Sequence, residues 1–348
     1  MSNRLLNFLV PFVSIVIGLI VGAIVMLVSG YNPIEGYIAL WQGIFGDLYT
    51  MGSTIRQITP YILSGLAVAF AFRTGLFNIG VEGQLLMGWL AAAWVGYAVD
   101  LPRIIHLPLA LLAAAAAGAF WALIVGVLKA RFNVHEVIAS IMLNYTALYI
   151  TNAVISRLSN GGYKTPSVLE SATLRNQWLR EFTGNSSMHL GIIVALLMVA
   201  VMWFILEKTT RGYELKSVGF NQNAAKYAGM DVKKNIILAM TISGVFAGLG
   251  GAMEALGTFQ TASIKATASG IGFDGIAVAL LGANSPLGVV FGASLFGSLK
   301  TGAINMQSNT MVPSEIVSII IGLIIFFVAS GYVIRLGITK FVKNREGK

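Results

Sequence analysis

Three carboxylates lie inside long apolar runs of the sequence, namely Glu82, Glu254 and Asp274. A charge at the centre of a bilayer costs about 2.5–3.5 kcal/mol, so such residues are candidates for handling a polar solute, a proton or a cation. A fourth carboxylate, Glu136, falls near the end of an apolar run. The sequence therefore predicts that its chemistry takes place within membrane-spanning segments and depends on few side chains.

Amide and aromatic side chains accompany these carboxylates. Asn78 lies in the stretch FNIGVEGQ, and Asn144 lies in the middle of a later apolar run. A polar solute would need such sparse amides together with aromatic faces, for which Phe77, Tyr145 and Phe273 are candidates. The same amides could instead join helix to helix, contributing under about 1 kcal/mol each. The candidate residues of a solute path are Asn78, Glu82, Asn144, Phe77, Tyr145, Asp274 and Glu254.

Residue types that other chemistries require are missing. The chain has no cysteine, and its three histidines lie far apart without metal-ligand spacing, so we expect no disulfide, thiol chemistry or metal site. The phosphate-binding pattern GxxxxGK[ST] does not occur, because GSLKTG at 297–302 lacks its glycines. No nucleophile pair or cofactor motif is apparent, which argues against an intramembrane enzyme. We expect no cofactor and no ATP hydrolysis by this chain.

The composition is that of an integral membrane protein. Of the 348 residues, 56% are hydrophobic and only 11% are charged, whereas a soluble domain carries about 25% charged residues. Several apolar runs approach or exceed the roughly 20 residues that a helix needs to cross a bilayer. The alternating pattern of a β-barrel is missing. The sequence therefore predicts an all-α, polytopic membrane helical bundle that forms a single transmembrane domain over residues 1–348.

The bundle is expected to contain about ten spans. The predicted spans are 8–28, 55–72, 76–98, 106–128, 134–155, 190–206, 236–257, 273–284, 286–302 and 314–334. The pair 273–302 is ambiguous, because each piece is short or interrupted by GANSPLG, and it fits two crossings or a re-entrant hairpin. The first run exceeds the roughly 7–15 residues of a signal-peptide core and lacks a cleavage site, so we interpret it as a retained span.

Basic residues predict the orientation of the bundle. Most of the 23 Lys and Arg residues fall on one side if the N-terminus is cytoplasmic, as basic loops usually are. Both termini are then cytoplasmic, residues 156–189 form an extracellular segment and residues 207–235 form a cytoplasmic segment. The net charge of +9 is explained by these loops, and no nucleic acid partner is expected. An amphipathic helix around Leu174–Phe182 could lie on the membrane surface or support a docked protein.

Two similar motifs suggest an internal repeat. GLFNIGVEGQ at 75–84 and GIGFDGIAVALLG at 270–282 both place Gly, Phe and then Asn or Asp at the start of a span. They occupy comparable places in the two halves of the chain, as many transporters with internal repeats show.

A hydrated stretch, RGYELKSVGFNQNAAKYAGMDVKKN at 211–235, interrupts the apolar runs. Asn221 can cap a short helix and Gly229 can end it in the left-handed conformation. The helix over 222–228 would be about 10 Å long, which is marginal for a helix alone in water. We therefore interpret it as a knob held from both ends that docks on another protein, although a plain cytoplasmic loop would have the same composition.

The faces of this short helix differ in the size of their side chains. Ala224 and Ala228 share one face, with Ala225 beside them, whereas Lys226 and Tyr227 project elsewhere. One side is therefore expected to be nearly smooth.

The order of residues in this stretch resembles a known family. NAAKYAG matches the EAAxxxG pattern of ABC importer permeases, with Asn223 in place of the acidic residue, and RGYELKSVGFNQNAAKYAGM resembles the longer form in the branched-chain amino acid, ribose and nucleoside group. Together with GLFNIGVEGQ and GFDGIAVALLGANSPLG, the resemblance covers nearly the whole chain. The likeness is closest to permeases of nucleoside importers that work with basic-membrane-protein-type binding lipoproteins.

The resemblance implies partners and a location. In that family the matching segment is the coupling helix, which docks on a cytoplasmic ATPase subunit that uses the ATP. A second permease, homologous or identical, and an extracellular substrate-binding lipoprotein complete the importer in the lipid of the bacterial cell membrane. The lipoprotein supplies most of the selectivity. The implied ATPase contact residues are Arg211, Gly212, Gly219, Asn221, Ala224, Ala225 and Gly229.

Alternatives for the solute and the energy source stay open at this point. A sugar or a branched-chain amino acid would fit the same family, although FNIGVEGQ favours nucleosides by likeness. An ion-coupled secondary transporter is a further alternative, in which the three intramembrane carboxylates would carry protons or sodium.

Overall fold

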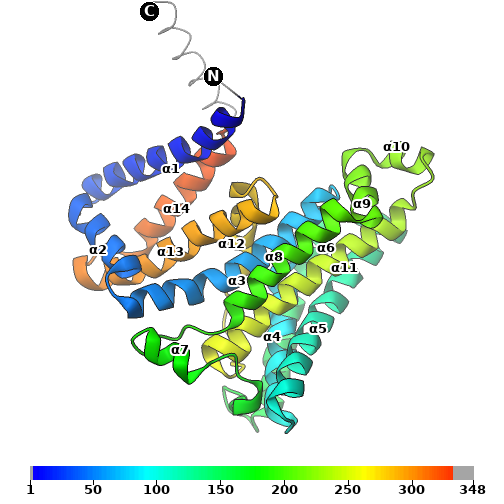
Figure 1. The fold of residues 1–348 in the computed structure, drawn as a ribbon, viewed down its shortest axis with the longest axis horizontal. Helices are drawn as coiled ribbons and strands as arrows, with labels where there is room; N and C mark the ends of the chain where they lie inside the picture. The colour runs from blue at the N-terminus through cyan, green and yellow to red at the C-terminus, as the bar shows by residue number, and fades with distance from the viewer. Residues whose placement is uncertain (1–2, 332–348) are drawn as a thin grey trace, which may run out of the picture. The chain divides into compact units, whose positions relative to one another are not determined.

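The computed structural model describes residues 3–331, and these residues form helices joined by turns and irregular segments (Figure 1). Within that range the only extended pairing is an isolated bridge between Lys164 and Ser263. The α-helices are α1 (Asn3–Val28), α2 (Pro33–Phe45), α3 (Leu48–Arg73), α4 (Val81–Ala98), α5 (Arg103–Phe132), α6 (Glu136–Leu158), α7 (Gln177–Phe182), α8 (Gly191–Lys208), α9 (Thr210–Phe220), α10 (Gln222–Tyr227), α11 (Val232–Ala252), α12 (Ile271–Leu281), α13 (Pro286–Thr310) and α14 (Ser314–Ala329). A 3-10 turn, η1 (Glu170–Ala172), and a π-helical turn, η2 (Met253–Phe259), complete the set.

The chain forms two compact units. One comprises residues 1–51 and 298–348, and the other comprises residues 52–297. Helices α3 and α13 each continue across the boundary between the units. We call them the terminal unit and the central unit.

The terminal unit pairs the first helix with the last. Gly18 and Gly22 of α1 lie so close to α14 that a Cβ atom on either would overlap an isoleucine side chain, Ile324 or Ile320. Tyr37 of α2 donates a hydrogen bond to the carbonyl oxygen of Leu19, at 2.5 Å. Glycine thus allows the close approach of apolar helices that membrane proteins use in place of a hydrophobic driving force.

The central unit is built around α11, which packs against α4 and α5. Small residues allow this packing, because Gly248 lies against the backbone of both Ala114 and Gly118 on α5. Gly88 of α4 approaches Gly248 just as closely. Any side chain at these crossings would separate the three helices.

Each of the ten predicted spans overlaps a helix. Six helices of the described chain are long and apolar enough to cross a membrane: 48–73, 103–132, 136–158, 191–208, 232–259 and 286–310. The prediction of a polytopic all-helical protein is confirmed, whereas the number of ten crossings and the cytoplasmic location of the termini stay predictions. The predicted last span, 314–334, and the basic residues Arg335, Lys340, Lys343, Arg345 and Lys348 extend into or lie in 332–348, outside the described residues.

The ambiguous pair at 273–302 consists of one short helix and one long helix. α12 has 11 residues and α13 has 25. At 1.5 Å per residue α12 is about 16 Å long, roughly half of the hydrocarbon thickness. The chain reverses between them at Ala283 and Asn284, whose φ angles of 49° and 52° are left-handed. The two helices are therefore neither two full-length spans nor a hairpin of two half-length helices.

The predicted outer and inner segments lie at opposite ends of the central unit. Figure 1 shows α7 at one end of the long helices and α9 with α10 at the other. The chain before α7 pairs with residues 260–264, as in the hydrogen bond from Thr165 N to Ala262 O at 2.9 Å. The amphipathic helix predicted around Leu174–Phe182 is shorter than expected, because α7 has only six residues.

Candidate functional site

The hydrated stretch folds into three successive helices, each of which begins at a side-chain cap. Thr209 Oγ1 accepts a hydrogen bond from Gly212 N, Asn221 Oδ1 from Ala224 N, and Asp231 Oδ1 from Lys234 N, each at 3.0 Å. Such caps satisfy backbone donors that the first turn of a helix cannot pair internally. The caps therefore determine where α9, α10 and α11 begin.

The short helix α10 ends as the sequence predicts. Gly229 has a φ of 84°, and the backbone N–H of Met230 donates to Ala225 O at 3.0 Å. This left-handed ending is typical of glycine. The prediction of a short helix between Asn221 and Gly229 is confirmed, and its last helical residue is Tyr227.

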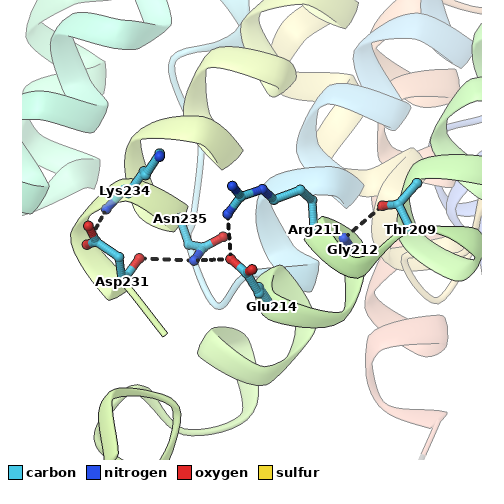
Figure 2. A network of polar contacts seen from close by, with 7 residues as sticks. All are labelled: Thr209, Arg211, Gly212, Glu214, Asp231, Lys234 and Asn235. Atoms are coloured by element: carbon cyan, nitrogen blue, oxygen red, sulfur yellow. Dashed lines mark hydrogen bonds and ion pairs between the residues drawn. The ribbon is translucent and has the colours of Figure 1, made fainter. Parts of the chain in front are cut away.

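A carboxylate joins α9 to α11 (Figure 2). Glu214 Oε2 accepts hydrogen bonds from Asn235 Nδ2 at 3.1 Å and from Arg211 Nη1 at 2.9 Å. Asn235 Nδ2 also donates to Asp231 O at 3.0 Å. The hydrogen bond from Asn235, followed by the one from Arg211, lowers the pKa of Glu214. The loop that carries α10 is therefore clamped to the start of α11.

Two glycines hold α9 against the ends of other helices. A Cβ atom at Gly219 would overlap the carbonyl oxygen of Arg73, and one at Gly212 would overlap that of Ile205. Lys216 of α9 adds an ion pair to Glu207 of α8, at 2.9 Å between Nζ and Oε2. These two glycines therefore allow α9 to pack closely against the ends of α3 and α8.

The predicted contact residues divide into a supporting set and an exposed set. Gly212 is buried, Gly219 is half-buried, and Ala225 is 3% exposed. Ala225 is therefore not part of the smooth outer face that we expected on α10, because its side chain is buried. The exposed members are Arg211, Asn221, Ala224 and Gly229.

Sequence reasoning underrated two aromatic residues, one at the end of α9 and one at the end of α10. Phe220 is 90% exposed and Tyr227 is 95% exposed. The sequence does indicate their exposure, because a loop with so short a helix has too few residues to bury two large rings. A protruding aromatic pair is typical of protein–protein contact sites.

The candidate path residues meet where two irregular segments approach each other. Glu82, in the first turn of α4, accepts hydrogen bonds from Ser269 Oγ at 2.6 Å, from Gly270 N at 3.1 Å and from Gly272 N at 2.7 Å. Glu82 is fully buried. Its carboxylate thus satisfies the first backbone donors of α12, and the two similar motifs of the sequence contact each other through it.

The two candidate amides bond to protein groups. Asn78 Nδ2 donates to Ser243 Oγ at 2.8 Å and to Gln84 Oε1 at 3.0 Å, and Asn78 is fully buried. Asn144 Oδ1 accepts from Gly83 N at 2.9 Å, and its Nδ2 donates to Ile79 O at 3.0 Å. These bonds hold the irregular segment 74–80 in place, which agrees with the helix-to-helix alternative. A direct role toward a solute stays a prediction for both residues.

The remaining candidates are scattered around this junction. Asp274 accepts a hydrogen bond from Tyr61 Oη at 3.1 Å, and Phe77 stacks on Phe72 with ring centroids 5.1 Å apart. Glu254 is 7% exposed in η2 and accepts from Thr258 Oγ1 at 3.1 Å. The three intramembrane carboxylates thus each have a protein donor.

A cavity of about 490 Å³ opens at the surface beside this junction, between α6 and the segment before α12. We call it the path cavity. Asn144, Tyr145 and Phe273 line it together with Tyr149, which sequence reasoning missed although it lies one helical turn from Tyr145. Tyr145 is 60% exposed and Tyr149 is 69% exposed. Asn78, Glu82 and Glu254 do not line it.

The backbone at the edge of the path cavity is unpaired. Residues 266–268 line the cavity, and their N–H and C=O groups form no hydrogen bond within the described residues. Lipid offers such groups no partner, and irregular backbone at membrane depth occurs only where it faces water or protein.

Comparison with known proteins gives one family and several relatives. A family profile described as "Branched-chain amino acid transport system / permease component" matches residues 50–329. The chain is 61% identical, over 99% of both chains, to the guanosine ABC transporter permease protein NupP of Bacillus subtilis strain 168.

Two further relatives carry similar names. The nucleoside ABC transporter permease protein NupB of Lactococcus lactis subsp. cremoris strain MG1363 is 39% identical over 98% of this chain and 95% of that protein. The guanosine ABC transporter permease protein NupQ of Bacillus subtilis strain 168 is 30% identical over 70% of this chain and 78% of that protein.

Proposed function

The chain belongs to the family of permease components of branched-chain amino acid transport systems, and from this premise we propose that it forms the translocation path of an ATP-driven nucleoside importer. The observation that carries the proposal is the 61% identity to a guanosine permease along 99% of the chain. A nucleoside permease with 39% identity supports the same solute class.

The path cavity supplies groups that suit a nucleoside. Tyr145, Tyr149 and Phe273 offer exposed ring faces for a base, and stacking of one base on an aromatic side chain is worth about 1–3 kcal/mol. The unpaired backbone groups of residues 266–268 offer donors and acceptors for ribose and base edges. Buried Glu82 binds the backbone just after these residues, and Asn78 and Asn144 hold the neighbouring segment 74–80 in place. In this proposal the solute moves along the cavity face with weak contacts.

A second permease would cover the same face. Bacillus subtilis has two proteins named guanosine permeases, and both are relatives of this chain. Their sequence relation supports pairing of this chain with a homologous permease. The unpaired backbone of residues 266–268 would then face a water-filled path between the two permeases.

Energy would come from a cytoplasmic ATPase subunit that grips α10. The clamp through Glu214 and Asn235 joins the loop to α11, and α11 packs against α4 and α5. Movement of α10 would therefore be transmitted to α4, which packs against α6 and α12 beside the path cavity. An extracellular lipoprotein would deliver the solute at the opposite end of the central unit.

Reconstituted transport tests this proposal. Proteoliposomes are prepared with this permease, its homologous partner and the ATPase, and the loaded lipoprotein is added outside. We expect labelled guanosine to accumulate only when ATP is inside, and to be unaffected by a protonophore. Accumulation against a gradient in vesicles that lack the ATPase would contradict the proposal and favour an ion-coupled carrier.

A further inference from the structure

A groove lies beside α10, between that helix and the end of α5. Its volume is about 580 Å³, and its lining includes Arg131 of α5, Asn223 and Lys226 of α10, and Lys233 of α11. We call it the basic groove. All four of these residues are exposed. Phe220 and Tyr227 do not line the groove, but they are close in sequence to its lining residues Gln222 and Lys226.

Three cations of the basic groove have no carboxylate partner among residues 3–331. Among the described residues, no carboxylate forms an ion pair with Arg131, Lys226 or Lys233. The neighbouring Lys129 is different, because it pairs with Glu136 at 2.8 Å. The one carboxylate in the lining, Asp231, caps α11 through Lys234 N.

The position that carries an acidic residue in the EAAxxxG pattern is an amide here. Asn223 occupies it and lines the basic groove next to Lys226. The chain therefore presents an amide beside a cation where the family pattern has an acidic side chain. A partner with a basic face would be repelled, because like charges brought together at an interface are destabilising.

We propose that the ATPase subunit contacts this chain through a carboxylate-bearing surface that lies in the basic groove, with Phe220 and Tyr227 inserted into apolar recesses beside it. This inference rests on the proposed function and specifies the chemistry of the partner. Exposed aromatic anchors surrounded by charged residues are typical of protein contact sites, and complementary charge sets orientation and partner choice.

The arrangement favours a protein over anionic lipid headgroups. Lipid-binding clusters of Lys and Arg lie immediately beside a membrane span, a position that Arg131 and Lys233 share but Lys226 does not. Here Lys226 and Asn223 lie on a six-residue helix that stands at the end of the long helices (Figure 1). Phe220, the last residue of α9, and Tyr227, the last residue of α10, are almost fully exposed, which suits a cleft on a protein.

Charge reversal in the assembled permease pair tests the proposal. The variants are Lys226→Glu and Arg131→Glu, with Lys164→Glu as a matched control on an exposed loop near α7. Binding of the purified ATPase is measured in nanodiscs of zwitterionic phosphatidylcholine at several salt concentrations. We expect each groove reversal to weaken binding about tenfold, equivalent to about 1.4 kcal/mol. The control is expected to bind as the wild type does.

Other outcomes separate this inference from the proposed function. Wild-type binding that resists salt, or groove reversals that bind the ATPase equally or more tightly, would overturn the basic groove alone. A wild type that retains no ATPase would overturn both. A defect that appears only in nanodiscs containing phosphatidylglycerol would identify a lipid as the occupant and overturn the proposal. Restored binding by Lys226→Glu with a reversed carboxylate on the ATPase would support it most directly.

Discussion

At the scale of single residues, Glu82 stabilises the fold, although its residue type suggested transport chemistry. Glu82 is a carboxylate in a membrane-spanning region, yet it is fully buried and accepts three hydrogen bonds at the start of α12. The N-terminus of a helix carries partial positive charge, which favours an anion there. These hydrogen bonds thus offset the cost of burying the carboxylate, and no bound cation is needed for this.

Replacing Glu82 with Gln tests this role. The amide keeps the size of the side chain but places an NH₂ group where a carboxylate oxygen faces a backbone donor. We expect the free energy of unfolding to fall by about 1–3 kcal/mol. Thermal unfolding in detergent measures this, with Glu315→Gln, at an exposed position of α14, as the control. Unchanged stability combined with lost uptake would show instead that Glu82 acts on the solute.

His189 predicts a pH dependence of stability. Burial, followed by the charges of Arg56 and Arg175, lowers its pKa from 6.5 to about 3. Its Nδ1 accepts a hydrogen bond from Gly191 N at 3.1 Å at the start of α8. The folded chain therefore holds the neutral ring, whereas the unfolded chain takes up a proton below pH 6.5. Stability is complete above that pH and is lost as the pH falls toward 3.

The expected slope is about 1.4 kcal/mol per pH unit below pH 6.5. Unfolding midpoints measured between pH 8 and pH 5 check it. The variant His189→Asn keeps an acceptor for Gly191 N but does not titrate, so its midpoint should vary less over this range. Equal slopes for the wild type and the variant would contradict the assignment.

At the scale of elements, the loop that carries α10 depends on one backbone conformation. Gly229 ends α10 with a φ of 84°, and a Cβ atom there would meet nothing within 4 Å. Only the left-handed backbone resists a side chain, at a cost of about 1–2 kcal/mol. Gly161, in the segment before α7, has the same φ and equally open surroundings. The two positions therefore form a matched pair.

We expect Gly229→Ala to lower ATP-driven uptake severalfold while the permease still inserts, because the strain shifts α10 relative to α9 and α11. Gly161→Ala carries the same backbone cost and should transport as the wild type does. Uptake and ATP hydrolysis measured in the same proteoliposomes check this. Equal uptake by both variants would show that α10 needs no defined position.

At the scale of the whole molecule, the path cavity requires surroundings that one chain does not supply. Its lining combines exposed rings with backbone at residues 266–268 that forms no hydrogen bond within the described residues, and in the proposed importer it faces water or a second permease. Apolar side chains on α8, such as Leu197, are exposed in a way that lipid accommodates. The two surfaces should therefore differ in their access to water.

Cysteine labelling in membranes tests this difference, because the chain has no cysteine of its own. Thr267→Cys should react with a charged thiol reagent, whereas Leu197→Cys should not. Guanosine supplied by the loaded lipoprotein should slow the reaction at residue 267. An unreactive Thr267→Cys would place the cavity face in lipid and remove the basis for the path.

The sequence by itself determined the class of the protein and the residues at which α10 begins and ends. Apolar runs predicted the helices, because lipid leaves the backbone no other way to pair its groups. Asn221 and Gly229 predicted α10, because a cap and a left-handed ending act on neighbouring residues. The residue order around α10 also indicated the family.

Only the tertiary structure decided which candidate residues are buried and stabilise the fold, and which are exposed. Glu82 and Gly272 are 190 residues apart in the chain, and no pattern in the sequence pairs them. Ala225 and Ala224 are adjacent and identical in type, yet one is buried and the other is exposed. Their difference arises from how α10 is held between α9 and α11. Contacts between distant segments set burial, and burial separates a supporting residue from one that a solute or a partner can reach.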